Sequence, residues 1–423
     1  MTGLNEFGNR IDMRRYAWFV VGLLWVVALL NYLDRQIIFS VLPLVRADLH
    51  LSNVQLGLLS TVFLWVYGIL SPSAGHLADR FGCRNIILLG LCAWSLVTWA
   101  TGQARTFSEL LVARGLMGIS EACYLPAALA LIAKLHGERT RSLATGLQFS
   151  GLYVGIIIGG FGGGWLGEHY GWRFAFSVLG IAGVAYCVFL HYALRNDAGG
   201  RGQARLPTPG FASAIRELIA LPGFVTLALV FAGMAVANWL VYTWLPLYLY
   251  ERFRMSLPEA GFVATFYNQA GCMIGMLAGG IMADWWSRKN PRARVLTQSL
   301  ALSAAAPALF LVGVTDSRLL LIGGLSIFGM ARAMYDCNAM PSLCSIARPE
   351  LRSTGYGIFN GAGCIAGGVM ASAAGWMKTN FGLTSSFYVA AGILLVSAVA
   401  LLTVPGAGAE ADEQAEPIVE PVA

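Results

Sequence analysis

Long runs of hydrophobic residues without a charged side chain recur along the whole chain. A transmembrane helix needs about 20 mostly apolar residues, and many of these runs reach that length. The charge-free runs cover residues 16–33, 51–75, 85–104, 142–167, 218–250, 260–283, 295–315, 353–377 and 379–409. Three further segments, around 107–135, 174–194 and 317–347, are hydrophobic with few interruptions. The pattern predicts an all-α membrane protein with twelve transmembrane helices, the first of them retained because no signal-peptide cleavage site follows it.

The overall composition supports this interpretation. The 423 residues are 57% hydrophobic and only 12% charged, against roughly 25% charged in a soluble domain. The net charge of +6 is spread among apolar runs, which argues against a nucleic-acid partner. Eight cysteines form no C-x-x-C pair, so we expect packing roles for them, with no disulfide framework, metal site or cofactor.

Basic residues between the spans predict the orientation. With both termini in the cytoplasm, 18 of the 28 Lys and Arg fall on the inside and seven on the outside, as the positive-inside rule requires. A polar, Gly- and Pro-rich stretch after the sixth span is typical of a linker, and the acidic C-terminus is typical of a disordered tail. The predicted domains are an N-terminal six-helix bundle (1–194), a cytoplasmic linker (195–222), a C-terminal six-helix bundle (223–404) and an acidic cytoplasmic tail (405–423).

The two predicted halves show weak internal repetition. The segment Gly75–Arg84 (GHLADRFGCR) recurs as Gly280–Lys289 (GIMADWWSRK), with an offset of 205 between the two aspartates. Four further residues of the first half match residues of the second at an offset of 211: Arg141 and Arg352, Gly146 and Gly357, Gly171 and Gly382, Phe176 and Phe387. The halves are therefore expected to be copies with the same topology, forming two pseudo-symmetric bundles.

At these residues the chain resembles the major facilitator superfamily over nearly its whole length. The superfamily's loop signature between spans two and three is G-x-L-A-D-R-x-G-(R/K)-(R/K), and Cys83 replaces its first basic position. Helix-end charges and close-packing glycines predict a gating contact between the halves at the cytoplasmic face, although a loop that only sets topology is the alternative. The predicted gating residues are Gly75, Asp79, Arg80, Gly82, Arg84, Asp284 and Arg288.

Six ionisable residues fall inside the predicted spans: Asp34, Arg35, Arg114, Glu121, Arg332 and Asp336. Each charge costs roughly 2.5 to 3.5 kcal/mol at a helix centre. The spacing of seven between Arg114 and Glu121, and of four between Arg332 and Asp336, places each pair on one side of its helix. That side is predicted to face a central cavity; ion pairs that only lock helices together are the alternative.

An Asp-Arg dipeptide late in span one, together with R-G-x-x-G-x-x-E in span four, resembles the anion:cation symporter family and the Spinster-type transporters. The resemblance implies that Asp34 and Glu121 carry a coupled proton, while Arg35 and Arg114 handle the negative charge of the substrate. An arriving anion could compete with Glu121 for Arg114, so that the released acid takes up a proton. Arg332 and Asp336 would supply a second charged element from the C-terminal half.

Several polar residues at mid-span depth are weaker candidates for hydrogen bonds to a substrate. We favour Tyr32, Tyr67, Asn268 and Asn360 for this role, with Asn238, Tyr242, Tyr267 and Gln269 as further candidates; an interhelical bond is the alternative for each.

The leading hypothesis is a secondary active transporter that couples protons to symport of a small organic anion, such as a sugar acid or other carboxylate, by alternating access. The alternatives are a Spinster-like carrier of lysolipid or another amphipathic substrate, an exchanger of phosphate esters, a membrane-embedded enzyme, and a sensor without transport. No catalytic motif favours an enzyme. The expected partners are the anion, protons and the lipid bilayer, for a monomer in a bacterial inner membrane that is driven by the proton gradient.

Overall fold

The structure, a computed structural model, describes residues 2–194 and 211–404, with side chains from residue 15 onward except those of 72–80, 138, 139, 142 and 211. These residues form fifteen helices and no strand. The helices are α1 (Thr2–Ser40), α2 (Leu42–Leu49), α3 (Asn53–Phe81), α4 (Cys83–Thr101), α5 (Phe107–Ala122), α6 (Tyr124–Leu135), α7 (Glu138–Tyr170), α8 (Trp172–Ala193), α9 (Phe211–Ala220), α10 (Phe224–Arg252), α11 (Leu257–Ser287), α12 (Ala293–Val314), α13 (Arg318–Cys344), α14 (Pro349–Phe381) and α15 (Thr384–Leu401).

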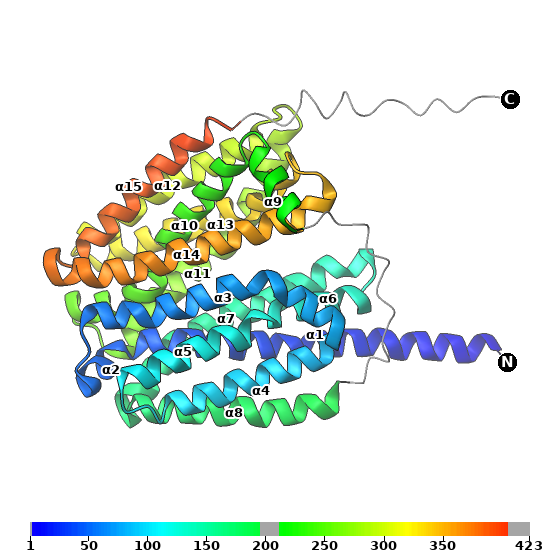
Figure 1. Cartoon of the computed structure of the whole chain (residues 1–423), viewed down its shortest axis with the longest axis horizontal. Helices are drawn as coiled ribbons and strands as arrows, with labels where there is room; N and C mark the ends of the chain where they lie inside the picture. Colours follow the sequence, from blue (N-terminus) through cyan, green and yellow to red (C-terminus); the bar gives the residue numbers. More distant parts are fainter. Residues whose placement is uncertain (1, 195–210, 405–423) are drawn as a thin grey trace.

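The helices gather into two halves that lie side by side (Figure 1). Helices α1 to α8 form one half and α9 to α15 the other. In the described part of the chain, eleven spans are long and apolar enough to cross a membrane, with α5 and α6 counted as one. The 31-residue α11 packs against α13 and α7 and fills the twelfth position. The predicted all-α architecture of twelve helices in two bundles is confirmed.

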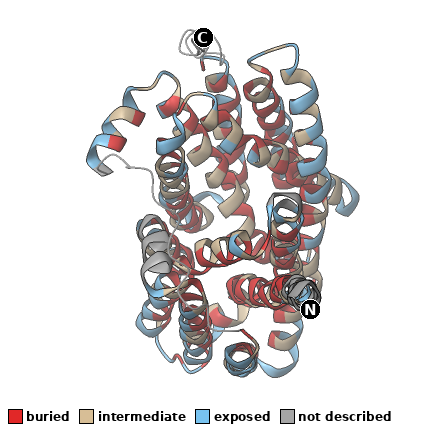
Figure 2. Cartoon of the chain, turned by 90° about the vertical axis from the view of Figure 1, so that its right-hand side faces the viewer, coloured by how far each residue is buried: buried red, intermediate tan, exposed pale blue. Residues whose placement is uncertain are grey.

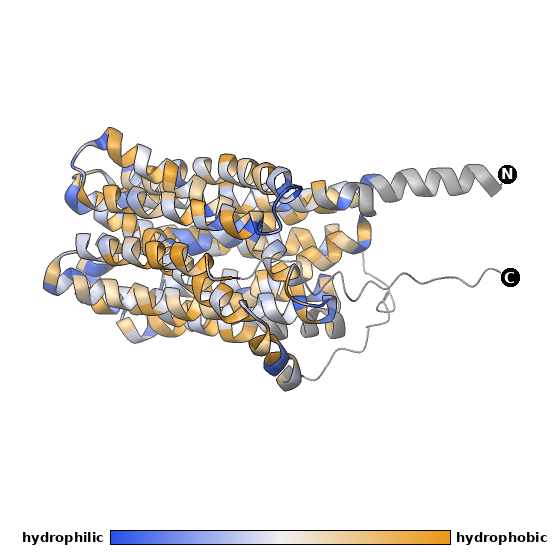
Figure 3. Cartoon of the chain, turned by 90° about the horizontal axis from the view of Figure 1, so that it is seen from above, coloured by the Kyte–Doolittle hydropathy of each residue, from blue (hydrophilic) through white to orange (hydrophobic). Residues whose placement is uncertain are grey.

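Hydrophobic residues run along the length of the helices, while hydrophilic residues gather mainly at their ends (Figure 3). Buried residues line the sides of helices that face other helices, and exposed residues cover the outer sides (Figure 2). Many exposed side chains are large and apolar, including Ile69, Leu229 and Val396. This distribution suits a bundle surrounded by lipid, because lipid tails are as apolar as the side chains that face them.

The internal repeat is visible in the backbone. Gly171 has φ 86° and ψ 153° between α7 and α8, and Gly382 has φ 84° and ψ 153° between α14 and α15. A positive φ is a conformation that glycine adopts without steric cost. Five residues after each glycine, inside the next helix, comes a fully buried phenylalanine, Phe176 or Phe387. The predicted offset of 211 therefore relates two copies of one turn.

The described residues of the loop signature bind within their own half. Arg84 donates from Nε to the Leu194 carbonyl at 2.9 Å and from Nη2 to the His191 carbonyl at 2.5 Å. These carbonyls belong to the last turn of α8 and the residue after it, where carbonyl oxygens lack helical partners. Arg292 does the same for the end of α15, donating to the Leu402 and Val404 carbonyls at 2.5 and 3.0 Å.

Among the other predicted gating residues, the three whose surroundings are described show no hydrogen bond or ion pair to the opposite half. Gly82 precedes α4 with φ 83°, Asp284 pairs with Arg294 at 3.3 Å, and Arg288 follows the end of α11. The side chains of Gly75, Asp79 and Arg80 lie outside the described residues. The gating contact stays a prediction, with Arg84 seen only on the end of α8.

Two helices occur where the sequence analysis placed loops. The linker 195–222 contains α9, whose Leu218 is fully buried and whose Glu217 pairs with Arg348 at the start of α14. Residues 195–210, like the tail 405–423, lie outside the described residues. Helix α2 follows α1 after a bend at Val41, whose amide donates to the Ile37 carbonyl at 3.2 Å.

We name the two ends of the bundle by what they carry. The α2 face holds α2 and the starts of α3 and α5. The terminal face holds the start of α4 and the helix α9 (Figure 1). Hydrogen bonds between the halves that involve fully described side chains extend from the α2 face inward. They join Arg46 to Glu251, Asn53 to Thr379, Ser60 to Thr243, Thr61 to Ser372 and to the Gly368 carbonyl, Trp65 to the Ile365 carbonyl, Glu168 to the Leu257 amide and, deepest, Ser71 to Asn360.

Close glycine contacts bring the halves together on the same side. Gly160 and Gly164 of α7 lie against Gly261 and Leu257 of α11, so that a Cβ on Gly164 would lie 2.5 Å from the Leu257 carbonyl oxygen. Small residues allow helix backbones to approach this closely. The halves are therefore in tight contact toward the α2 face.

Candidate functional site

The N-terminal half contains a buried ion pair between Arg35 of α1 and Glu121 of α5. Arg35 Nε donates to Glu121 Oε2, and the two residues are 5% and 1% exposed. The spacing in the sequence predicted Arg114 as the neighbour of Glu121; the structure instead pairs Glu121 with Arg35. A buried carboxylate and guanidinium stabilise each other only when they are in contact, so this pair is the electrostatic centre of the half.

Aromatic rings surround the Arg35 guanidinium. Its central carbon lies 4.8 Å from the ring centre of Tyr32, 5.0 Å from Phe63 and 4.7 Å from Tyr67. These distances lie within the range of cation–π attraction. Two of the predicted ligand residues, Tyr32 and Tyr67, are thus placed beside Arg35, and both are partly exposed.

Asp34 points away from this pair toward α4. Thr98 Oγ1 donates to Asp34 Oδ2 at 3.2 Å, whereas Asp34 Oδ1 is buried and has no hydrogen-bond partner within the described part of the chain. The residue is 2% exposed, and no cationic group described here lies within ion-pair distance of it. A buried charge without a partner is costly, so this environment suits a carboxyl group that can hold a proton.

Arg114 of α5 has no carboxylate partner among the described residues. Its Nε donates to the Leu59 carbonyl at 3.3 Å and its Nη1 to the Met117 sulfur at 3.1 Å. Its Nη2 has no partner among the side chains and backbone groups described, and the residue is 1% exposed. Phe63 lies 4.9 Å from the guanidinium carbon. The arginine thus keeps a donor and its positive charge available.

The C-terminal half provides the third arginine. Arg332 of α13 donates from Nη1 to Asn238 Oδ1 at 2.7 Å, and from Nη2 to the Cys272 sulfur at 2.9 Å and to Gln269 Oε1 at 3.4 Å. All three acceptors are uncharged groups from α10 and α11. Asn238 and Gln269 were weaker candidates in the sequence, while Cys272 was assigned to packing. Cys272 and Arg332 are 60 residues apart, so nothing in the sequence indicates that they are in contact.

Asp336 lies one helical turn after Arg332 on α13, but these two described residues do not form an ion pair. Its side chain is exposed, unlike that of its neighbour Tyr335. The two residues remain close enough to influence each other electrostatically. The predicted placement of both residues on one side of the helix is therefore consistent with the structure, but their side chains do not form an ion pair.

The remaining predicted ligand residues lie on the C-terminal half. Asn268 is buried beside Arg332's partner Gln269, and its Oδ1 has no partner in the described structure. Asn360 donates to Ser71 Oγ across the two halves at 3.4 Å. Asn268 therefore offers a free acceptor, whereas Asn360 participates in the deepest contact between the halves.

Four of these charged and polar residues, two from each half, lie at one depth. Glu121, Tyr67, Asn238 and Arg332 are each fourteen residues from the end of their helix at the α2 face, or about 21 Å at the helical rise. We call these residues, together with Arg35 and Gln269, the middle layer. The middle layer places cationic groups of the two halves at the same level of the bundle.

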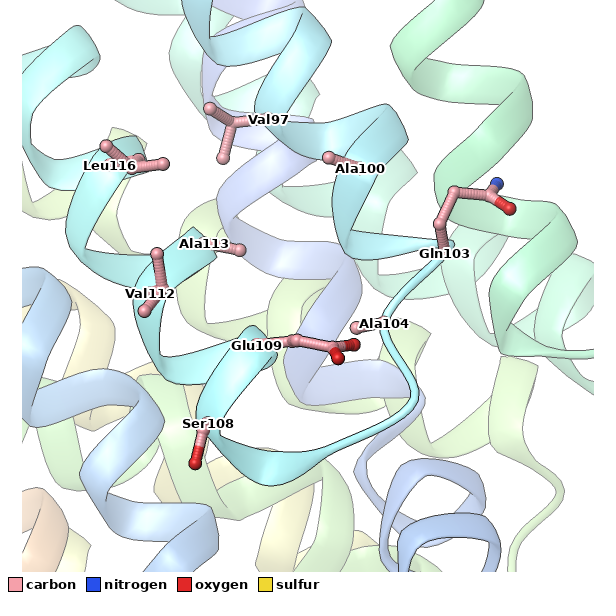
Figure 4. A pocket seen from close by; sticks show the side chains of 9 residues that line it. All are labelled: Val97, Ala100, Gln103, Ala104, Ser108, Glu109, Val112, Ala113 and Leu116. Carbon is pink, nitrogen blue, oxygen red and sulfur yellow. The ribbon is translucent and has the colours of Figure 1, made fainter.

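A surface pocket is located elsewhere, between α4 and α5 near the α2 face (Figure 4). Its walls include Val97, Val112 and Leu116, with Gln103 and Glu109 toward one end. Arg114 and Glu121 do not line it. In the described part of the chain there is also no cluster of three or more His, Cys, Asp or Glu side chains that could hold a metal ion.

Comparisons with known proteins agree on the kind of protein. The sequence profile of the Major Facilitator Superfamily matches residues 24–371 and 270–423. The chain is 27% identical over 391 residues to the "Probable galactarate/D-glucarate transporter GudP" of Bacillus subtilis, a match that covers 85% of this chain and 84% of that protein. It is 29% identical over 315 residues to "Protein spinster homolog 1" of Xenopus tropicalis, covering 70% of this chain but 60% of that protein.

A solved structure has a similar fold. A bacterial homolog to the human lysosomal transporter Spinster, in an inward-facing and occupied conformation, superposes with a TM-score of 0.77 at 22% sequence identity. The superposition covers 92% of this chain and 96% of that chain.

Proposed function

Because the chain belongs to the Major Facilitator Superfamily and is a multi-pass membrane transporter rather than an enzyme, we propose that it carries a small organic anion, a sugar acid or another carboxylate, together with protons. The proposal rests on a single observation. Of the three arginines inside the bundle, Arg114 and Arg332 are bound only to uncharged acceptors. Two cations inside the bundle without a carboxylate partner, one buried and one half-buried, favour an anionic substrate.

Arginine suits this task because it stays charged and presents several donors in a fixed plane. In the proposed cycle, the carboxylate of the substrate binds at the middle layer, with Arg332 on the C-terminal half and Arg35 on the N-terminal half. The substrate would then draw the halves together, as alternating access requires. The names of the relatives support the class of substrate, since one of them is described as a galactarate/D-glucarate transporter.

The proton is assigned to Asp34 and Glu121. If the substrate takes over the contacts of Arg35, Glu121 loses its cationic partner in a buried place, and taking up a proton removes the uncompensated charge. Asp34 has one hydroxyl donor and no cation in contact with it, so the same argument applies to it. Anion and proton would therefore move in the same direction, and the proton gradient would supply the energy without a cofactor.

We place both termini in the cytoplasm of a bacterial cell, with the protein acting as a monomer in the inner membrane. The loop charges support this orientation. The α2 face would then be on the outside, and the tight contacts between the halves on that face would make this conformation inward-facing.

The test uses purified protein in liposomes that contain a pH-sensitive dye. D-glucarate, galactarate, other organic acids, sugar phosphates and lysolipids are added one at a time, and wild type is compared with Glu121→Gln. Glu109→Gln is the matched control, because Glu109 is an exposed acid on the same helix that accepts a hydrogen bond from the Arg105 amide. We expect one organic acid to acidify the lumen with wild type and the control, but not with Glu121→Gln.

Other outcomes would contradict the proposal in defined ways. Movement of an acid without any change in luminal pH would remove the coupling role of Glu121 and leave the ion pair as a structural one. Transport of a lysolipid or a phosphate ester alone would replace the proposed substrate class.

A further inference from the structure

Two polar groups from opposite halves lie near one aromatic ring and have no hydrogen-bond partner in the described part of the chain. Arg114 Nη2 of α5 and the Tyr242 hydroxyl of α10 are both enclosed, and neither has a hydrogen-bond partner in the described regions. An enclosed polar atom without a partner loses its bonds to water and regains nothing. A protein keeps such atoms where another state or a ligand satisfies them.

Phe39 of α1 brings these two groups together. Its ring centre lies 5.4 Å from that of Tyr242, with the rings at 75°, and 5.9 Å from the Arg114 guanidinium carbon. The arginine and the phenol therefore flank one aromatic ring at the boundary between the halves.

Both groups are fixed in position. Arg114 Nε is anchored by the Leu59 carbonyl, and the next residue of α3, Ser60, bonds to Thr243 Oγ1 at 3.2 Å. Thr243 follows Tyr242 on α10. The contact that closes the halves thus involves the residue next to Tyr242 and the residue next to Leu59, which anchors Arg114.

The backbone positions of these two residues lie nearer to the α2 face than those of the middle layer. Arg114 is seven residues, about 10 Å, from the start of α5 at the α2 face, and Tyr242 is ten residues, about 15 Å, from the end of α10 there. The middle layer lies at about 21 Å by the same measure. The Arg114 and Tyr242 pair is therefore nearer to the α2 face by one to two helical turns.

We propose that Arg114 Nη2 and the Tyr242 hydroxyl form an outer anion subsite, which binds the substrate carboxylate when the halves open at the α2 face, before the carboxylate reaches the middle layer. This inference rests on the proposed function, and it assigns Tyr242 as the residue of the C-terminal half that contacts the substrate there. Arginine supplies the charge and the phenol supplies a second donor, so the carboxylate is bound by both halves at once.

The subsite explains why the two groups are unpartnered in the closed arrangement. The halves meet through Ser60 and Thr243 close to the depth of Arg114 and Tyr242, so a carboxylate reaches these two groups from the α2 face only when the halves open. A carboxylate bound there would then transfer inward to Arg35 and Arg332, which remain the cations of the middle layer.

The test compares the two directions of transport. D-glucarate uptake is measured in right-side-out and inside-out vesicles, with the α2 face located by an impermeant maleimide on an R46C variant. Tyr242→Phe removes only the hydroxyl. Tyr186→Phe is the matched control, because its hydroxyl donates to the Leu23 carbonyl at 2.9 Å, within the N-terminal half.

We expect Tyr242→Phe to raise the KM for substrate arriving at the α2 face by about ten-fold, as loss of one hydrogen bond to a charged group does. The KM from the terminal face should change less than two-fold, and the control should change neither. Arg114→Lys, which keeps the charge but loses the fork, should show the same directional bias, and thermal melting of each variant in detergent verifies its folding.

The outcomes separate the subsite from the proposed function. If wild type transports D-glucarate and Tyr242→Phe alters both directions equally or neither, the outer subsite is refuted while organic-anion transport stands. If wild type moves none of the acids in the panel, the proposed function fails, and the subsite, which depends on it, fails as well.

Discussion

Arg35 combines an ion pair and contacts with aromatic rings in one buried side chain. It forms an ion pair with Glu121, it lies among the rings of Tyr32, Phe63 and Tyr67, and it is almost fully enclosed. Removing one partner of a buried pair leaves the other charge uncompensated, which costs about 3 to 5 kcal/mol, whereas removing both charges together costs much less. The pair therefore constrains stability and function through the same atoms.

This reasoning gives a prediction for stability. Arg35→Gln should lower the melting temperature in detergent strongly, since Glu121 would remain buried without its cation. The double variant Arg35→Gln/Glu121→Gln should recover most of the loss, although both proteins are inactive in transport. A double variant no more stable than the single one would show that the aromatic packing of Arg35, rather than the charge, maintains the fold.

Arg332 offers a second prediction at this scale. Arg332→Lys keeps the charge but cannot reach Asn238, Gln269 and Cys272 with one planar group, so we expect the KM for the transported acid to rise about ten-fold. The control is Arg318→Lys at the start of the same helix, where Arg318 forms an exposed pair with Glu259 at 2.9 Å. An unchanged KM for Arg332→Lys would remove Arg332 from the binding site.

At the scale of elements, the contact between α7 and α11 controls how closely the halves approach. A Cβ on Gly160 would lie 2.6 Å from the Gly261 carbonyl oxygen, whereas a Cβ on Gly162 would meet only the Ile158 side chain at 3.8 Å. The two glycines belong to one helix but face different surroundings.

We therefore expect Gly160→Ala to slow transport by preventing full closure at the α2 face, and Gly162→Ala to leave transport unchanged. Initial uptake rates at matched expression measure the effect, and accessibility of R46C to an impermeant maleimide reports the closure. Equal rates for the two variants would indicate that α7 and α11 can separate slightly without loss of function.

The sequence allowed the elements to be predicted better than their contacts. Twelve apolar segments and the 211-residue repeat were readable because lipid imposes length and composition on each span. Span four is divided at Cys123, where Pro126 has no amide hydrogen to donate to the Ala122 carbonyl. Glu121 pairs with Arg35 rather than Arg114 because of how α1 packs against α5. The spacing of residues within α5 carries no information about that packing.

At the scale of the whole molecule, one carboxylate connects both halves at the rim of the α2 face. Glu251 of α10 accepts from Lys378 Nζ at 2.6 Å within its own half and from Arg46 of α2 at 3.1 Å in the other half. The side chain of Lys378 is 10% exposed, while that of Arg46 is 41% exposed. The two cations therefore depend on Glu251 to different degrees.

Arg46→Ala should destabilise the fold by less than about 1 kcal/mol, as expected for an exposed pair, but it should speed opening at the α2 face. Glu251→Ala should lower the melting temperature more, since it also removes the counter-charge of Lys378. Melting curves and uptake rates at low and high salt distinguish these effects, because salt screens the exposed pair most. Identical melting temperatures for the two variants would contradict this ranking.

The common depth of the middle layer has a consequence for the response to membrane potential. A potential of 100 mV changes the energy of one elementary charge that crosses the whole membrane by about 2.3 kcal/mol. Arg35, Glu121 and Arg332 lie near the level about which the halves would rock, so their own displacement along the field is small. We expect the voltage dependence of transport to reflect the net charge of the anion and its protons. The current measured per transported anion of known charge would then give the number of protons carried with it.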